Sequence, residues 1–213
     1  DAFFTELGDR RTAIRAVSID MSGGYQKASR EQLPDAEICF DPFHVVRVAA
    51  DAVDQVRRDE GTARPLQNHG RQVGKHTRWA LLKAPARQSQ QTLATLGEVY
   101  VKNRQLNRAS LHCCQLRLLY ALDDPSLAPA HLDAWISWAA RSKLAPFVKA
   151  ASTLREHRQG ILAAVRLGLS NGRLEGLNSR VPISHSSFGF IAAPLIALIY
   201  LCCGGITIDL PFT

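Results

Sequence analysis

The sequence predicts a helix-dominated α/β fold, in which a large all-helical insertion interrupts a small core of strands and helices. Two short apolar segments, residues 13–20 and 36–41, each end in an aspartate and are typical of buried strands. Residues 77–168 instead show helical periodicity without a strand pattern. We therefore expect a first part of the core, a helical insertion and a closing part of the core, over residues 1–58, 59–168 and 169–213.

The first elements of the core follow one another closely. A short helix is expected at the start of the chain, with three apolar residues on one face: Phe3, Phe4 and Leu7. The strand at 13–20 is followed by a helix that has Ser22 as a candidate N-cap and stops before Pro34. Because a second strand then begins at residue 36, the order implies a parallel pair joined by a right-handed crossover.

An amphipathic helix is expected next, over residues 43–59. Its apolar residues recur at the helical period: Val45, Val48, Ala49, Ala52, Val53 and Val56. Residues 59–76 are polar and basic and contain glycine, which predicts a loop before the helical stretch begins.

The composition is that of a globular, basic protein. With 213 residues, of which 46% are hydrophobic and 21% charged, the chain can bury a core. Its formal charge of +7 is compatible with a polyanionic partner such as nucleic acid, although many basic proteins bind none. The longest apolar run, residues 191–203, is interrupted by Pro194 and is too short to span a bilayer, so we expect no membrane segment.

The cysteines form two adjacent pairs and a single, without a C-x-x-C spacing: Cys39, Cys113, Cys114, Cys202 and Cys203. This pattern favours reduced thiols in a cytoplasmic protein over a disulfide framework. The segment "LHCCQL" at 111–116 has zinc-ligand residue types but no zinc-site spacing, and we interpret it as the interior of a helix.

Two aspartates end the candidate parallel strands, and a glutamate stands in a turn-rich segment close to the apolar end. Asp20 and Asp41 would lie at the same edge of the sheet, where neighbouring strands are about 4.8 Å apart. Carboxylates placed in this way can bind Mg²⁺, and Glu175 in "SNGRLEGLNSRV" could supply a further ligand. The alternative is that the aspartates form turns or cap helices, which is the commoner use of an acid at the end of a strand.

Three further residues have both a functional and a structural interpretation. His44 lies three positions after Asp41 at the start of a helix, where a histidine is more often capping or packed than catalytic. Arg78 and Trp79 set a cation beside an aromatic ring, and such a ring can stack on an unpaired base. A tryptophan within "RWALL" is more often part of a core, so both interpretations stay open.

Six segments, in this order, resemble the bacterial insertion-sequence transposases of the ISL3 family: "VSIDMSGGYQKA", "LPDAEICFDPFHVV", "VRRD", "TRWALLK", "SNGRLEGLN" and "APLIALIYLCCGG". The resemblance implies a DDE transposase, with an RNase H-like core that an all-helical insertion interrupts. It also implies cleavage and transfer of double-stranded DNA, at transposon ends and target, with two Mg²⁺ or Mn²⁺ ions. The full-length protein would be a homo-oligomer located in the bacterial cytoplasm, at the nucleoid.

The resemblance assigns the candidate site residues. Asp20 matches the second catalytic acid and Glu175 the third, and both are expected to bind metal. Asp41 and His44 match a D-x-x-H signature and are expected to support catalysis or to position the DNA strand. The expected DNA-contacting residues are Arg78, Trp79, Arg173, Asn178 and Arg180. We expect roughly 4–8 Å between the carboxylates of the two metal ligands, because both must reach a metal pair about 4 Å across.

The chain departs from the family pattern at its start. The first three strands of the core and the first catalytic acid have no counterpart in it, so we expect a partial RNase H-like core in a C-terminal fragment that is inactive alone. Their absence is expected to uncover Ile14, Val17 and Ile19. Two alternatives stay open, which are a catalytically dead remnant that binds DNA or oligomerises, and a self-sufficient triad of the three acids.

Overall fold

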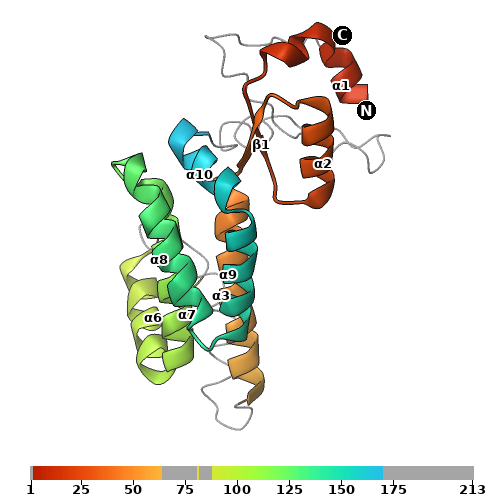
Figure 1. Ribbon diagram of the computed structural model, residues 1–213. Coiled ribbons are helices and arrows are strands. Elements are labelled where there is room, and N and C mark those ends of the chain that lie inside the picture. Colours follow the sequence, from red (N-terminus) through yellow and green to blue (C-terminus); the bar gives the residue numbers. More distant parts are fainter. Residues whose placement is uncertain (1, 64–80, 82–87, 170–213) are drawn as a thin grey trace. The chain divides into compact units, whose positions relative to one another are not determined.

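The structure is a computed structural model, and it describes residues 2–63, 81 and 88–169 (Figure 1). Within these residues the helix-dominated α/β character is confirmed, because two short strands are accompanied by helices alone. The chain forms two compact units, which are Asp1–His44 with Gln159–Thr213, and Val45–Arg158. The segment limits expected from the sequence, at residues 58 and 168, stay predictions.

The first unit contains both strands. Its elements in chain order are α1 (Ala2–Leu7), η1 (Gly8–Ala13), β1 (Ala16–Ile19), α2 (Gly23–Gln32), β2 (Glu37–Phe40), the start of α3 (Pro42–Ala63) and most of α10 (Arg158–Leu167). The strands pair in parallel, with Ile19 opposite Phe40. Figure 1 shows β1 between α2 and α10. The strand, helix, strand order is therefore as predicted, although the first strand is shorter than expected because Ile14 N–H still closes the preceding turn on Arg11 O (3.2 Å).

The apolar residues of the first strand are covered. Ile14, Val17 and Ile19 are each no more than 2% exposed. The expectation that these residues lack cover is wrong, because α2 contacts β1 and Leu33, which follows α2, is also buried.

Helix α10 approaches the sheet through small residues. One buried cluster joins the strands to this helix and to the residues after it: Ala16, Cys39, Ala163, Ala164 and Leu169. Gly160 lies so close to β2 that a Cβ atom added there would be 2.6 Å from Cδ2 of Phe40. Arg166 donates a hydrogen bond to Oε1 of Glu37 (2.6 Å). Because Phe40 ends β2 and Glu37 begins it, α10 runs in the direction opposite to that strand.

The second unit is built from helices in the residues that the structure describes. They are the rest of α3, α6 (Gln90–Lys102), α7 (Arg104–Leu118), η3 (Leu119–Ala121), η4 (Pro125–Leu127), α8 (Ala128–Ala140) and α9 (Ala145–Glu156). The large, fully buried side chains of this unit include Phe147 and several leucines: Leu106, Leu116, Leu119, Leu132 and Leu154. Helix α3 continues to Ala63, beyond the loop start expected at 59, and Asn103 Nδ2 donates to Oε2 of Glu60 (3.0 Å) in this extension.

The described cysteines carry free thiols, as predicted. Cys39 and Cys113 are buried, and burial raises the pKa of the Cys113 thiol to about 11. A thiol with so high a pKa is a poor nucleophile at neutral pH, so this cysteine packs rather than reacts. None of the helices in the described ranges is long and apolar enough to cross a membrane.

Gly160→Ala is expected to destabilise the protein by about 1–3 kcal/mol, although alanine stabilises a helix by roughly 0.5–1 kcal/mol relative to glycine where space allows. The new Cβ would also lie 2.9 Å from the carbonyl oxygen of Ile38, which is backbone and cannot rotate away. Urea denaturation followed by circular dichroism measures the change.

Gly97→Ala in α6 is the matched control, because nothing lies within 4 Å of a Cβ added at Gly97. We expect this variant to be at least as stable as the wild type. If Gly160→Ala also gains stability, α10 and β2 do not approach as closely as the structure has them.

Candidate active site

Asp20 and Asp41 directly follow the two paired strands. Since Ile19 and Phe40 are opposite each other, the next residues along both strands are these two acids. Asp41 N–H donates to Ile19 O (2.9 Å), which continues the ladder by one bond. Because the strands are parallel and in register, both acids lie at the same edge of the sheet, and their main chains are about 4.8 Å apart, the spacing of neighbouring strands. This is the carboxyl edge, where ligand sites form in open parallel sheets.

The carboxylate of Asp20 is partly exposed and has a local structural role. Its Oδ1 accepts a hydrogen bond from Ser22 N–H (2.7 Å), so it stabilises the turn before α2. Ser22 occupies the N-cap position as predicted, but its own side chain makes no capping hydrogen bond. The pKa of Tyr25 is raised by burial and, to a smaller extent, by the negative charge of Asp20. Asp20 therefore forms the turn before α2 from a position at the carboxyl edge of the sheet.

Asp41 and His44 form a hydrogen-bonded pair at the start of α3. The Asp41 side chain is 1% exposed, and its Oδ2 lies 3.0 Å from Nδ1 of His44, whose side chain is 34% exposed. A carboxylate can only accept, so the imidazole carries a proton on Nδ1. The ring of Phe43 meets the His44 ring edge-on, with 5.3 Å between centroids. The buried acid thus orients the imidazole of His44 through its Nδ1 atom.

The remaining predicted site residues lie outside the described residues. They are Glu175, Arg173, Asn178, Arg180, Arg78 and Trp79. The distance expected between the carboxylates of Asp20 and Glu175 therefore stays a prediction. Within the part of the chain that the structure describes, no three His, Cys, Asp or Glu side chains gather closely enough to hold a metal.

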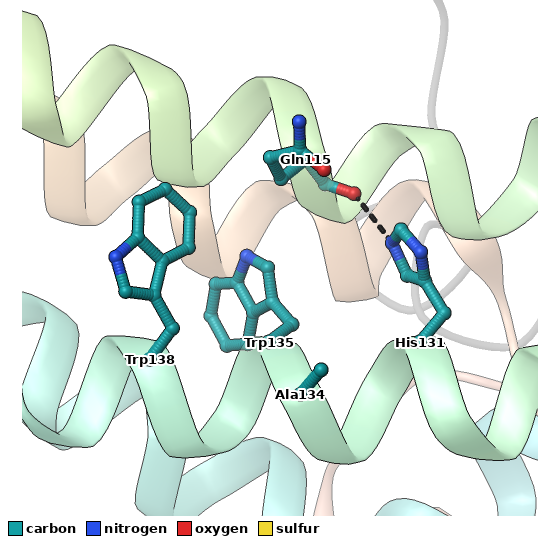
Figure 2. A pocket seen from close by; sticks show the side chains of 5 residues that line it. All are labelled: Gln115, His131, Ala134, Trp135 and Trp138. Carbon is teal, nitrogen blue, oxygen red and sulfur yellow. Dashed lines mark hydrogen bonds between the residues drawn. The ribbon is translucent and has the colours of Figure 1, made fainter.

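The segment "LHCCQL" lies inside α7, and His112 and Cys113 are buried there, as predicted for a helix interior. The sequence analysis missed a pocket between α7 and α8, which Trp135 and Trp138 line together with His131 (Figure 2). The spacing of three positions in "WISW", which sets both tryptophans on neighbouring parts of one helix face, was the available signal.

Comparisons with known proteins identify the family. A family model described as a transposase, of the DDE ISL3 type, matches residues 1–193. The transposase for insertion sequence element IS1557 of Mycobacterium tuberculosis strain H37Rv is 34% identical over 233 aligned positions, which cover 98% of this chain and 52% of the relative. The transposase for insertion sequence element IS1001 of Bordetella parapertussis is 29% identical over 192 positions, which cover 89% of this chain and 47% of that relative.

No solved structure matches the chain. The chain spans about half the length of the curated relatives it matches. The family model nevertheless covers most of the chain, and a relative above 30% identity covers nearly all of it. The chain belongs to the ISL3 family of insertion-sequence transposases.

Proposed function

We propose that this chain forms the part of a DDE transposase that carries two of its three catalytic acids, Asp20 and Glu175, on a partial RNase H-like core. The whole protein would cleave double-stranded DNA at transposon ends and transfer the strand to a target. The supporting observation is that Asp20 and Asp41 follow two in-register parallel strands at their common carboxyl edge. Ligand sites of open parallel sheets form at this edge.

Asp20 and Glu175 would hold the divalent metals in this proposal. The partly exposed carboxylate of Asp20 fits the preference of Mg²⁺ for a few carboxylate oxygens combined with water and phosphate oxygens. The chemistry that two Mg²⁺ or Mn²⁺ ions supply at such a site is activation of a water or 3′-hydroxyl and stabilisation of the leaving oxygen. The buried Asp41 is engaged by His44 and suits a supporting role better than direct metal binding.

The chain length after α10 is sufficient for Glu175 to reach this edge. Leu169 is 5% exposed in the cluster with the strands, and its N–H donates to Ala164 O (3.1 Å), while Gly168 takes a φ of +62°. This is the geometry with which a helix ends and the chain turns back. Glu175 follows Leu169 by six positions (175 − 169), and an extended chain of that length spans up to about 20 Å. This exceeds the length of the four-residue strand β1, which is about 13 Å, so the chain can pass from the position of Leu169 to the carboxyl edge.

His44 would position the DNA strand. When its ring is protonated, Nδ1–H stays on the carboxylate of Asp41 and Nε2–H can donate to a phosphate oxygen. The buried acid fixes the ring, so little freedom would be lost on binding.

The formal charge of +7 supports a DNA partner. We place further DNA contacts at five residues, which are Arg78, Trp79, Arg173, Asn178 and Arg180. A homo-oligomer at the nucleoid, in the cytoplasm, completes the proposal.

The test compares the chain alone with the chain joined to an upstream segment that contributes an Asp-bearing strand. Both are incubated with end-labelled duplex DNA in Mg²⁺, Mn²⁺ or EDTA, and nicking and joining are measured on denaturing gels. We expect activity from the extended protein, in the presence of metal, and none from residues 1–213 alone, because two metals need a third acid beside the two assigned here.

Cleavage by residues 1–213 alone would overturn the assignment and favour a self-sufficient triad of acids. An extended protein that stays inactive but binds DNA, or blocks an intact relative, would instead support the catalytically dead remnant.

A further inference from the structure

Helices α7 and α8 of the second unit line an open pocket that the proposed catalysis does not use. Its volume is about 330 Å³, within the usual range for small-ligand pockets. The pocket is lined by Gln115, His131, Ala134, Trp135 and Trp138. Figure 2 shows His131, Trp135 and Trp138 in a row along α8, with Gln115 on α7 facing them. The Trp138 side is accessible, because this residue is 39% exposed while Trp135 is buried.

Ring contacts support Trp138 from inside the protein. The His112 ring has its centroid 3.6 Å from that of Trp138, with a tilt of 39° between the two rings, and it stacks on Phe147 with 4.9 Å between centroids. His112 and Phe147 are both 0% exposed. Trp135 is also fixed, because its Nε1–H donates to His112 O (2.8 Å). The indole of Trp138 is thus a flat aromatic surface that is already ordered before a ligand arrives, which lowers the entropic cost of binding.

The rim of the pocket offers hydrogen-bonding groups in fixed places. Nε2 of His131 lies 2.8 Å from the main-chain oxygen of Gln115, as the dashed line in Figure 2 marks. A carbonyl only accepts, so Nε2 of His131 carries a proton. The Gln115 side chain is exposed and adds one amide donor group and one acceptor. An aromatic face beside such donors and acceptors matches the face and the edge of a nucleobase.

The helix that lines one side of the pocket is basic. Helix α7 contains Arg104, Arg108 and Arg117 and no acidic residue. Arg108 donates to Ser142 O (2.6 Å), which places its guanidinium at the end of α8, about one turn beyond Trp138. The exposed Arg141, which directly precedes Ser142 in the sequence, lies at the same end of α8.

The single acid of α8, Asp133, accepts two hydrogen bonds from Arg158 (2.7 and 2.8 Å). Its charge is therefore largely offset by a cation of its own. An anionic chain such as a DNA strand is favoured over an apolar peptide as the ligand of this surface.

We propose that this pocket binds an unpaired nucleobase of a DNA strand, stacked on Trp138, with the adjoining phosphates beside Arg108 and Arg141. Base stacking on aromatic side chains tolerates any sequence, because every base has a π-face. A base within a duplex is covered on both faces, so the pocket selects single-stranded or extruded nucleotides. This inference does not depend on the carboxylates of the proposed catalytic site.

The test measures binding of residues 1–213 to a fluorescein-labelled 12-nucleotide strand, in EDTA, by fluorescence anisotropy. A strand of equal length with abasic sites keeps the phosphates but removes the bases. Trp138→Ala is expected to weaken binding of the normal strand by about tenfold, the loss typical of one stacked base, and to leave binding of the abasic strand unchanged. Trp138→Phe retains most of the affinity, because a ring remains, and Arg141→Ala weakens binding of both strands.

Leu127→Ala is the matched control, because Leu127 is apolar and 55% exposed but does not line the pocket. Circular dichroism of each variant checks the fold. The proposal is overturned if Trp138→Ala binds the normal strand like the wild type, or if the wild type binds normal and abasic strands equally. It is also overturned if sedimentation shows that Trp138→Ala abolishes self-association while DNA binding persists, which would make this face a protein interface. Because EDTA removes the metals, these outcomes are independent of whether the extended protein cleaves DNA.

Discussion

Asp20→Asn and Glu175→Gln are each expected to lower metal-dependent DNA cleavage by about 10³-fold or more in the protein extended by its Asp-bearing strand. In the proposed site each change would remove one anionic oxygen ligand from a pair of metals that would stabilise developing charge, and the loss of one such group in other enzymes has effects of about that size. The amides keep the shape of the side chains, and an asparagine in place of Asp20 can still accept a hydrogen bond from Ser22 N–H. Single-turnover cleavage of labelled duplex DNA in Mg²⁺ measures the loss.

Asp35→Asn is the matched control. Asp35 is exposed in the turn between α2 and β2, which leads into the start of β2 and is therefore away from the carboxyl edge of the sheet. It is expected to leave cleavage unchanged.

A structural role of Asp20 is distinguished from metal binding by Asp20→Cys. A thiolate is a poor ligand for Mg²⁺, which requires oxygen, but is better accepted by the softer Mn²⁺. We expect this variant to be inactive in Mg²⁺ and to regain activity in Mn²⁺. Full activity of Glu175→Gln in Mg²⁺ would remove Glu175 from the site.

The half of the candidate site that the structure describes could be predicted because its geometry is local. Two apolar segments that each end in an aspartate, joined by one helix, pair in parallel, and the register then sets Asp20 beside Asp41. Asp41 directly precedes α3 and His44 lies in its first turn, and this spacing of three positions likewise brings their side chains together. Glu175 is 155 positions from Asp20 along the chain (175 − 20), and its place depends on how the residues between them fold, which no local pattern determines.

The errors of the sequence analysis have a common physical origin, which is tertiary packing. Ile14, Val17 and Ile19 were expected to be uncovered, yet α2 and its neighbours bury them. The close contact of Gly160 with Phe40 joins residues 120 positions apart (160 − 40), and a glycine within a helix pattern does not reveal its partner. The contact of the His112 ring with Trp138 was missed for the same reason, because "LHCCQL" and "WISW" belong to different helices.

The stability of the second unit is expected to fall as the pH is lowered from about 6.5 towards 4, and His112 is a principal cause. Burial, and next the positive charge of Arg108, lower the pKa of His112 from 6.5 to about 4. The unfolded chain therefore takes up a proton near pH 6.5, while the folded ring stays neutral until about pH 4. Since the unfolded state binds more protons in this window, the free energy of unfolding decreases as the pH falls, by a total on the order of 3 kcal/mol.

His112→Leu is expected to remove this part of the pH dependence. Neither ring nitrogen of His112 has a hydrogen-bond partner among the described residues, so replacing the buried polar ring by an apolar side chain leaves no partner unsatisfied. At pH 7 the variant should be as stable as the wild type or more stable, although the loss of ring contacts with Trp138 and Phe147 reduces the gain in the free energy of unfolding. Urea denaturation at pH 7.5, 6 and 5, followed by tryptophan fluorescence, gives both free energies of unfolding.

His131→Gln is the matched control, because His131 is a histidine of the neighbouring helix at the pocket surface rather than in the core. It should keep most of the acid sensitivity of the wild type, whereas His112→Leu should lose it. Other carboxylates contribute to acid unfolding in every variant, since the pKa of Asp133 is lowered by its hydrogen bonds to Arg158, so only the difference from the wild type reports on His112. If His112→Leu and the wild type lose stability in parallel between pH 7.5 and 5, the imidazole is not held neutral in the fold, and its position between Trp138 and Phe147 must be more accessible to water than the structure indicates.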